Sequence, residues 1–300
     1  MTRRTAYAAH TRFVAPALGT PGARPVILGF IIVESLYRMG QQLLGYLLEA
    51  IDPEFAAAVF DGSTPAGLLV NLGSFVILAL CLALTLHWVH GRRMTSLLGP
   101  IAQLWPQARA TFGAVMLVFV AFEALTTGFA VAPGTIIRPL PDWLLLLIPG
   151  LAVLLIQISS EEMFYRGYLQ QQIAALAPHP AAWLILPNVA FAVAHISPYA
   201  AFEENLAYLT WTFCFGLAAS DLTARAGTLG PALGLHFANN AYAFLLYGEA
   251  GGLDSGLALV LYPAPDPGMP GLEAAPTIGL LPELAILAVT WGAARLALRR

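Results

Sequence analysis

Uncharged apolar runs alternate along this chain with short stretches rich in proline, glycine and charge. A helix needs about 20 largely apolar residues to cross the hydrocarbon core of a bilayer. By that measure the pattern predicts eight membrane helices, near residues 26–50, 65–88, 110–132, 143–172, 181–198, 204–224, 229–247 and 277–297. The expected fold is therefore an all-α polytopic membrane protein, whose fourth helix is long enough to project beyond the bilayer.

The composition supports a membrane protein and removes several classes of function. Hydrophobic residues make up 58% of the chain and charged residues 10%, against about 25% charged in an average soluble domain. All 14 basic residues are arginine, which excludes chemistry that needs a lysine, and their scatter makes nucleic acid an unexpected partner. Cys81 and Cys214 lie inside apolar runs and are interpreted as small packing residues, not as disulfide or zinc ligands.

The arginines predict how the chain is oriented in the membrane. With eight spans, most of them fall on one side, and Arg138 is the only basic residue in the opposite, acidic loops. Because cytoplasmic loops carry an excess of basic residues, both termini are expected in the cytoplasm and the protein in the plasma (inner) membrane. The segment 94–108 is expected either to lie along the cytoplasmic surface as a short amphipathic piece or to form a plain loop.

Candidate chemistry begins at the end of the fourth predicted helix, where Glu161, Glu162 and Arg166 follow an uncharged run. Ionisable groups at membrane depth are costly and seldom persist without a partner or a task. Residues four apart share a helix face, so Glu162 is expected to pair with Arg166. Glu161 points about 100° away and could face a cavity as a general base. The simpler interpretation of these charges is a helix end at the membrane surface.

Further polar groups lie in later apolar helices. His195 follows Phe191 by four residues, and His236 and Asn240 share one face of the seventh predicted helix. The turn between the fourth and fifth helices centres near residue 179, with Glu161 eighteen residues before it and His195 sixteen after it. An antiparallel hairpin therefore places the two nearly level. A glutamate, two histidines and an amide in an apolar cavity suggest hydrolysis by activated water.

In their order and spacing, these residues resemble the CPBP family, which includes the CAAX prenyl endoproteases and the bacteriocin-processing and immunity (Abi) proteins. The matching motifs are Glu-Glu-x-x-x-Arg, Phe-x-x-x-His and His-x-x-x-Asn, at Glu161, Glu162, Arg166, Phe191, His195, His236 and Asn240. The resemblance implies an intramembrane endopeptidase that cleaves a membrane-associated peptide or protein. Glu161 would be its base, the histidines would position water or the oxyanion, and Asn240 would complete the oxyanion hole.

The resemblance also implies how the rest of the site and the chain are used. Glu162, Arg166 and Phe191 would hold the shape of the site.

We expect the chain to be divided into a cytoplasmic segment 1–25, peripheral helices with a cytoplasmic loop 26–140, and a catalytic core with a C-terminal helix 141–300. The alanine-rich, lysine-free composition suggests a GC-rich bacterial genome, which disfavours a prenylated substrate.

Three alternatives stay open at this stage. Zinc held by Glu161, His195 and His236 would supply three ligands and an open position, although a metal-free site is favoured because neither histidine lies in a His-Glu-x-x-His motif. A proton-coupled transporter would also bury such residues, but would more often show an internal repeat. A non-catalytic immunity or binding protein of the same fold could carry the same motifs.

Overall fold

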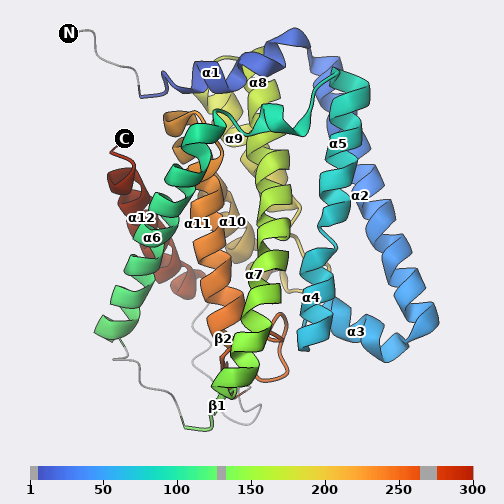
Figure 1. Cartoon of the computed structure of the whole chain (residues 1–300), viewed down its shortest axis with the longest axis vertical. Helices are drawn as coiled ribbons and strands as arrows, with labels where there is room; N and C mark the ends of the chain where they lie inside the picture. The colour runs from blue at the N-terminus through green and yellow to red at the C-terminus, as the bar shows by residue number, and fades with distance from the viewer. Residues whose placement is uncertain (1–5, 127–132, 264–275, 300) are drawn as a thin grey trace.

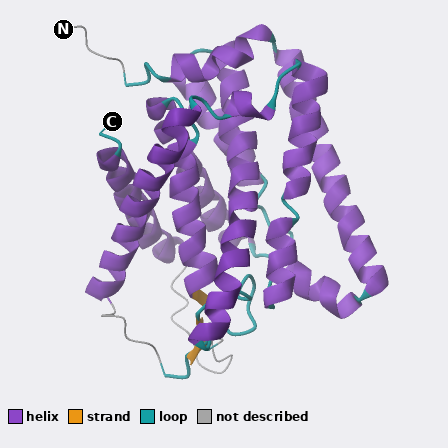
Figure 2. Ribbon diagram, viewed as in Figure 1, coloured by secondary structure: helices purple, strands orange, loops and turns teal. Residues whose placement is uncertain are grey.

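The computed structural model describes residues 6–126, 133–263 and 276–299 and is built mainly of helices (Figure 2). The helices are α1 (His10–Val14), α2 (Ala23–Ile51), α3 (Pro53–Asp61), α4 (Pro65–Gly73), α5 (Val76–His90), α6 (Ile101–Thr126), α7 (Leu140–Glu162), α8 (Gln170–Leu176), α9 (Pro180–Val193), α10 (Phe202–Ala226), α11 (Gly230–Ala241) and α12 (Pro276–Ala297). Helical turns of other types cover Ala15–Gly19, Met94–Leu97, Met163–Leu169 and Tyr242–Leu246.

A helix occupies each of the eight segments in which the apolar pattern predicted one. Within the described residues, four helical segments are long and apolar enough to cross a membrane: Pro65–His90, Ile101–Thr126, Leu140–Leu176 and Gly279–Ala297. A fifth is added if His10–Gly19 and Ala23–Ile51, which meet at 91°, count as one broken span. The polytopic, all-α membrane fold is therefore confirmed, while eight as the exact number of spans stays a prediction. The predicted end of the third helix, 127–132, lies outside the described residues.

The bundle has α7 near its centre, with α6 and α11 on one side and α4 and α5 on the other (Figure 1). The turn predicted near residue 179 is present, since α8 ends at Leu176 and α9 begins at Pro180, with His179 accepting a hydrogen bond from the Ala181 amide. The start of the described chain and the end of α12 lie toward the same end of the bundle. That arrangement agrees with termini on one side of a membrane, and the cytoplasmic assignment of that side stays a prediction.

The sequence did not indicate a small sheet at the opposite end of the bundle (Figure 1). Its strands are β1 (Ile136–Ile137), β2 (Tyr247–Glu249) and β3 (Val260–Tyr262). β3 lies in the middle, antiparallel to β1 and parallel to β2. Strands of two or three residues are too short to show the alternation of apolar and polar positions from which strands are predicted.

The segment 94–108 was expected to lie along the cytoplasmic surface or to form a plain loop. This was wrong for residues 101–108, which belong to α6, the helix that begins at Ile101. The first turns of α6 pack against α11, where two glycines let the helix backbones approach closely. A Cβ atom on Gly230 would lie 2.2 Å from the Leu104 carbonyl oxygen, and one on Gly234 would lie 2.3 Å from that of Ala108. Small residues serve this purpose at helix interfaces in membranes. The contact holds the first turns of α6 against α11, which carries two candidate site residues.

Candidate active site

Glu161 and Glu162 end α7, and the chain continues as a π-helical segment, Met163–Leu169. The two side chains are both buried, at 6% and 0% exposure. Because they are neighbours on one helix, they point in different directions and meet different partners. π-helical turns are rare and often occur at functional sites. A second such segment, Tyr242–Leu246, follows α11 directly, so both helices that carry the site change their winding beside it.

Glu162 is held by two cationic or hydrogen-donating groups on the side away from the cavity. Its Oε1 atom accepts a hydrogen bond from Arg166 Nη1 at 2.9 Å, so the ion pair expected from their spacing is present. The same oxygen lies 2.8 Å from His236 Nδ1. The Arg166 guanidinium also lies 4.1 Å from the centre of the Phe191 ring, close enough for a cation–π contact. These contacts join α7, the π-helical turn, α9 and α11 around one carboxylate.

Glu161 lines a cavity of about 940 Å³ that extends between α7, α10, α11 and α12. Gln157, one turn earlier in α7, donates a hydrogen bond from Nε2 to Glu161 Oε2 at 2.8 Å. His236 Nε2 lies 3.6 Å from the same oxygen. Its spacing alone suggested that the Glu161 carboxylate would be free, but the structure shows that it accepts a hydrogen bond. The carboxylate lies at the cavity wall, whereas Glu162 is turned away from the cavity.

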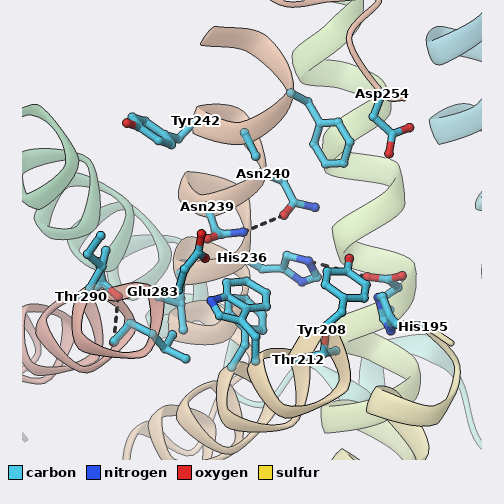
Figure 3. Close-up of a pocket in the computed structure, with 18 of the residues that line it drawn as sticks. His195, Tyr208, Thr212, His236, Asn239, Asn240, Tyr242, Asp254, Glu283 and Thr290 are labelled. Carbon is cyan, nitrogen blue, oxygen red and sulfur yellow. Dashed lines mark hydrogen bonds and ion pairs between the residues drawn. The ribbon is translucent and has the colours of Figure 1, made fainter. Parts of the chain in front are cut away.

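A chain of amides runs from α11 to Glu161. Asn239 Nδ2 donates to Asn240 Oδ1 at 3.2 Å, a hydrogen bond drawn in Figure 3. Asn240 Nδ2 in turn donates to Gln157 Oε1 at 2.9 Å, and Gln157 donates to Glu161. Since a side-chain amide nitrogen carries two hydrogens, Asn240 keeps one for another acceptor. Sequence reasoning missed Gln157, although its position four residues before Glu161 was a usable signal.

His195 lies two residues beyond the end of α9, half-buried, and lines the same cavity. Its Nδ1 atom is 2.7 Å from the Phe191 carbonyl oxygen, which can only accept, so Nδ1 carries the hydrogen and Nε2 is left for the cavity. Its ring lies 5.9 Å from that of Tyr208 on α10, and Figure 3 shows the two side by side. His195 is thus on the cavity wall with Glu161, without a direct bond to it.

Glu161, His195 and His236 are the candidate zinc ligands. Within the described parts of the chain, no three side chains of histidine, cysteine, aspartate or glutamate are grouped as a metal site. The Nδ1 atom of His236 is engaged with Glu162. Glu161 accepts a hydrogen bond from the Gln157 amide, which in turn accepts one from the Asn240 amide. Amides in these places suit hydrogen bonding better than zinc coordination.

Comparison with known proteins assigns a family to the segment that holds most of this site. Residues 142–242 match the family described as "Type II CAAX prenyl endopeptidase Rce1-like". The uncharacterized protein YyaK of Bacillus subtilis (strain 168) is 29% identical over 116 residues, which cover 37% of this chain and 38% of that protein. The match thus spans well under half of the length of this relative. No solved structure matches the chain. Residues 142–242, about a third of the chain, thus match the type II CAAX prenyl endopeptidase family, which supports the resemblance to the CPBP family.

Proposed function

We propose that this protein is an intramembrane endopeptidase that hydrolyses a peptide bond of a membrane-associated protein or peptide, using water activated by Glu161. One observation supports this proposal above the others. Of two adjacent buried glutamates, Glu162 is bound by Arg166 and His236, whereas Glu161 is oriented on the wall of a large cavity beside a histidine and two amides. This is the division of roles that a general base and its support need.

The first step is the activation of water. With Nδ1–H directed at Glu162, a neutral His236 has Nε2 available as an acceptor. A water that donates one hydrogen to His236 Nε2 and the other to Glu161 Oε2 would be held between groups 3.6 Å apart. Glu161 takes a proton from this water, and the oxygen attacks the carbonyl carbon of the substrate. A positioned general base typically contributes about 10²- to 10⁴-fold to the rate.

The second step is stabilisation of the tetrahedral intermediate and its collapse. The remaining amide hydrogen of Asn240 can donate to the oxyanion, because the other one is fixed on Gln157. The neutral tautomer of His195 offers an acceptor at Nε2, which suits orientation of water or of the departing amine. The C–N bond then breaks as Glu161 returns its proton to the amine nitrogen. The products are a carboxylic acid and an amine, between which one proton passes to give a carboxylate and an ammonium group, and Glu161 is ionised again.

Arg166 and Phe191 act on the structure of the site and make no contact with the reacting atoms. Arg166 is fully buried and neutralises Glu162, whose negative charge would otherwise stand next to the base. The Phe191 ring lies 4.1 Å from the guanidinium and 4.6 Å, centre to centre, from the His195 ring, so it contacts both. We assign the chemistry to the 141–300 part of the chain and a supporting role to the helices before it.

The two rival functions differ from a protease in an observable way. A proton-coupled transporter needs Glu161 to exchange protons with both sides of the membrane, and a binding protein needs no turnover at all. Neither uses an oxyanion donor, whereas the Asn240 amide is oriented by Asn239 and Gln157 as such a donor would be. The arrangement therefore favours hydrolysis.

The test compares membrane and secreted peptides from cells that make the wild type, Glu161→Gln or Glu203→Gln. Glu203 is an exposed glutamate in the first turn of α10, outside the cavity, and serves as the matched control. We expect at least one processed peptide that disappears with Glu161→Gln and persists with Glu203→Gln. An unchanged set of peptides in the Glu161→Gln cells, with equal amounts of the protein in the membrane, would contradict the proposal.

A further inference from the structure

The carboxylates and arginines described in the wall of the cavity beside Glu161 are of one kind, since all of them are carboxylates. Its wall includes four carboxylates, Glu161, Glu204, Asp254 and Glu283, from four different parts of the chain. No arginine is among the described residues that line it, and the chain has no lysine. A cavity with low-dielectric walls and charges of one sign concentrates ligands of the opposite charge. The charge alone does not define a site, so the individual side chains matter.

Glu283 is the carboxylate that stands out. It lies in α12, inside the candidate span Gly279–Ala297, and makes no hydrogen bond or ion pair with any residue that the structure describes. By contrast, Glu204 accepts a hydrogen bond from the Ala201 amide at 3.0 Å. Figure 3 shows the Glu283 side chain extending toward Asn239, the first amide of the chain that ends at Glu161. A carboxylate at membrane depth is costly without a partner or a task.

A second observation points to a ligand in the same cavity. Thr212 is 1% exposed and lines the cavity, and its hydroxyl has no hydrogen-bond partner among the residues that the structure describes. Buried hydroxyls are nearly always satisfied, so an unsatisfied one on a cavity wall is a place where a ligand can bind. Trp211, next to it on α10, and Tyr242 also line the cavity, and aromatic rings of this kind attract cations.

We propose that Glu283 forms a subsite for a positively charged side chain, arginine or lysine, of the peptide segment that is cleaved. The inference rests on the proposed function and specifies its substrate class. A guanidinium would place its charge against the Glu283 carboxylate, in a cavity whose wall also includes Thr212 and aromatic rings. A segment that presents an aspartate, a glutamate or a chain-terminal carboxylate there would be repelled by the same wall.

Binding of two matched probes tests this assignment without knowledge of the natural substrate. The probes are acetyl-Phe-Arg-amide and acetyl-Phe-citrulline-amide, which differ in charge and hardly in shape. Their affinities are measured by titration calorimetry on the purified full chain in a neutral detergent. We expect the arginine probe to bind the wild type about tenfold or more tightly than the citrulline probe, as a charge-assisted contact would give. Glu283→Gln should remove that preference, and Glu203→Gln should keep it.

A charge reversal provides the second variant. Glu283→Arg should lose the arginine probe and gain acetyl-Phe-Glu-amide, because the exposed position of Glu283 tolerates a long side chain. Equal binding of the arginine and citrulline probes to the wild type would overturn the proposal. So would an arginine preference that survives Glu283→Gln, since the charge would then be recognised elsewhere.

The two proposals fail in different ways. Suppose that Glu161→Gln abolishes processing in cells, while Glu283→Gln alters neither probe binding nor the KM for the processed peptide. The protease proposal is then supported and the subsite proposal is contradicted. If Glu161→Gln leaves processing intact, the protease proposal falls, and the probes still decide whether Glu283 binds a cation. A raised KM with unchanged kcat for Glu283→Gln would support both.

Discussion

Gln157 and Asn240, 83 positions apart in the chain, are joined by a hydrogen bond of 2.9 Å that links α7 to α11. The bond fixes the Asn240 amide on one side and, through Gln157 Nε2, the Glu161 carboxylate on the other. The candidate base and the candidate oxyanion donor are therefore positioned by one side chain. Sites of this kind tolerate little displacement, since an error of about 1 Å can cost about 100-fold in rate.

Gln157→Leu should lower kcat by about 10- to 100-fold with a small effect on KM, because the base and the oxyanion donor lose their common support while the cavity keeps its volume. Cleavage kinetics on the processed peptide measure the effect. Gln157→Glu keeps the length of the side chain but places a second carboxylate against Glu161, and should be at least as damaging. Full activity in Gln157→Leu would show that the link is not used.

The chain contains two Glu–Arg pairs with the same spacing in different surroundings, which gives a matched comparison of stability. Arg166 and Glu162 are fully buried, whereas the Arg38 side chain, 3.4 Å from Glu34, is 68% exposed. Arg166→Ala should cost about 3 to 5 kcal/mol because it leaves a buried carboxylate unpaired. Arg38→Ala should cost less, because the Glu34 side chain that it leaves unpaired is 18% exposed and not fully buried.

Thermal or denaturant unfolding in detergent measures both variants. The double variant Glu162→Gln, Arg166→Met should recover part of the loss, since no unpaired charge is left buried. Similar destabilisation by Arg166→Ala and Arg38→Ala would contradict the picture of a buried pair that holds the site together.

Gly234→Val should impair both folding and activity, because its side chain would meet the Ala108 carbonyl and push α11, with His236 and Asn240, away from α6. The control is Gly113→Ala on α6, where a Cβ atom meets nothing within 4 Å. That substitution should be neutral or stabilise the helix by up to about 1 kcal/mol. Melting temperature and cleavage rate distinguish the two positions, and equal effects would show that the close approach of α6 and α11 is not needed.

The metal prediction follows from the amides around Glu161. Protein purified without added metal should contain no stoichiometric zinc, and chelators should leave its activity intact. If zinc instead lowers the pKa of a bound water toward 7, His195→Ala or His236→Ala should remove zinc and activity together. Elemental analysis that finds about one zinc per chain, lost with activity on chelation and restored with zinc, would contradict the metal-free mechanism.

Sequence alone predicted the parts of the site that depend on spacing within one helix. Glu162 and Arg166 pair at four residues apart, and His236 and Asn240 share a face of α11, because a regular helix fixes such neighbours. The level placement of Glu161 and His195 followed from counting outward from the turn at residue 179. The resemblance drawn from these motifs is confirmed by the family match over residues 142–242.

The parts that were missed depend on contacts between helices distant in sequence. Gln157 is a neutral amide in an apolar run, and only the position of α11 reveals what it binds. Glu283 was not singled out, because its place on the cavity wall depends on how α12 packs against α10. The π-helical turns after Glu162 and Ala241 likewise carry no sequence pattern that predicts them.

The most direct test of the account compares Glu161→Gln with Glu162→Gln in the purified protein, on the processed peptide, with stability measured in parallel. We predict that Glu161→Gln keeps its melting temperature and loses about 10²-fold or more of its cleavage rate. Glu162→Gln should lose stability, because Arg166 is left unpaired. Full cleavage activity in a folded Glu161→Gln protein would contradict the claim that this carboxylate activates the water.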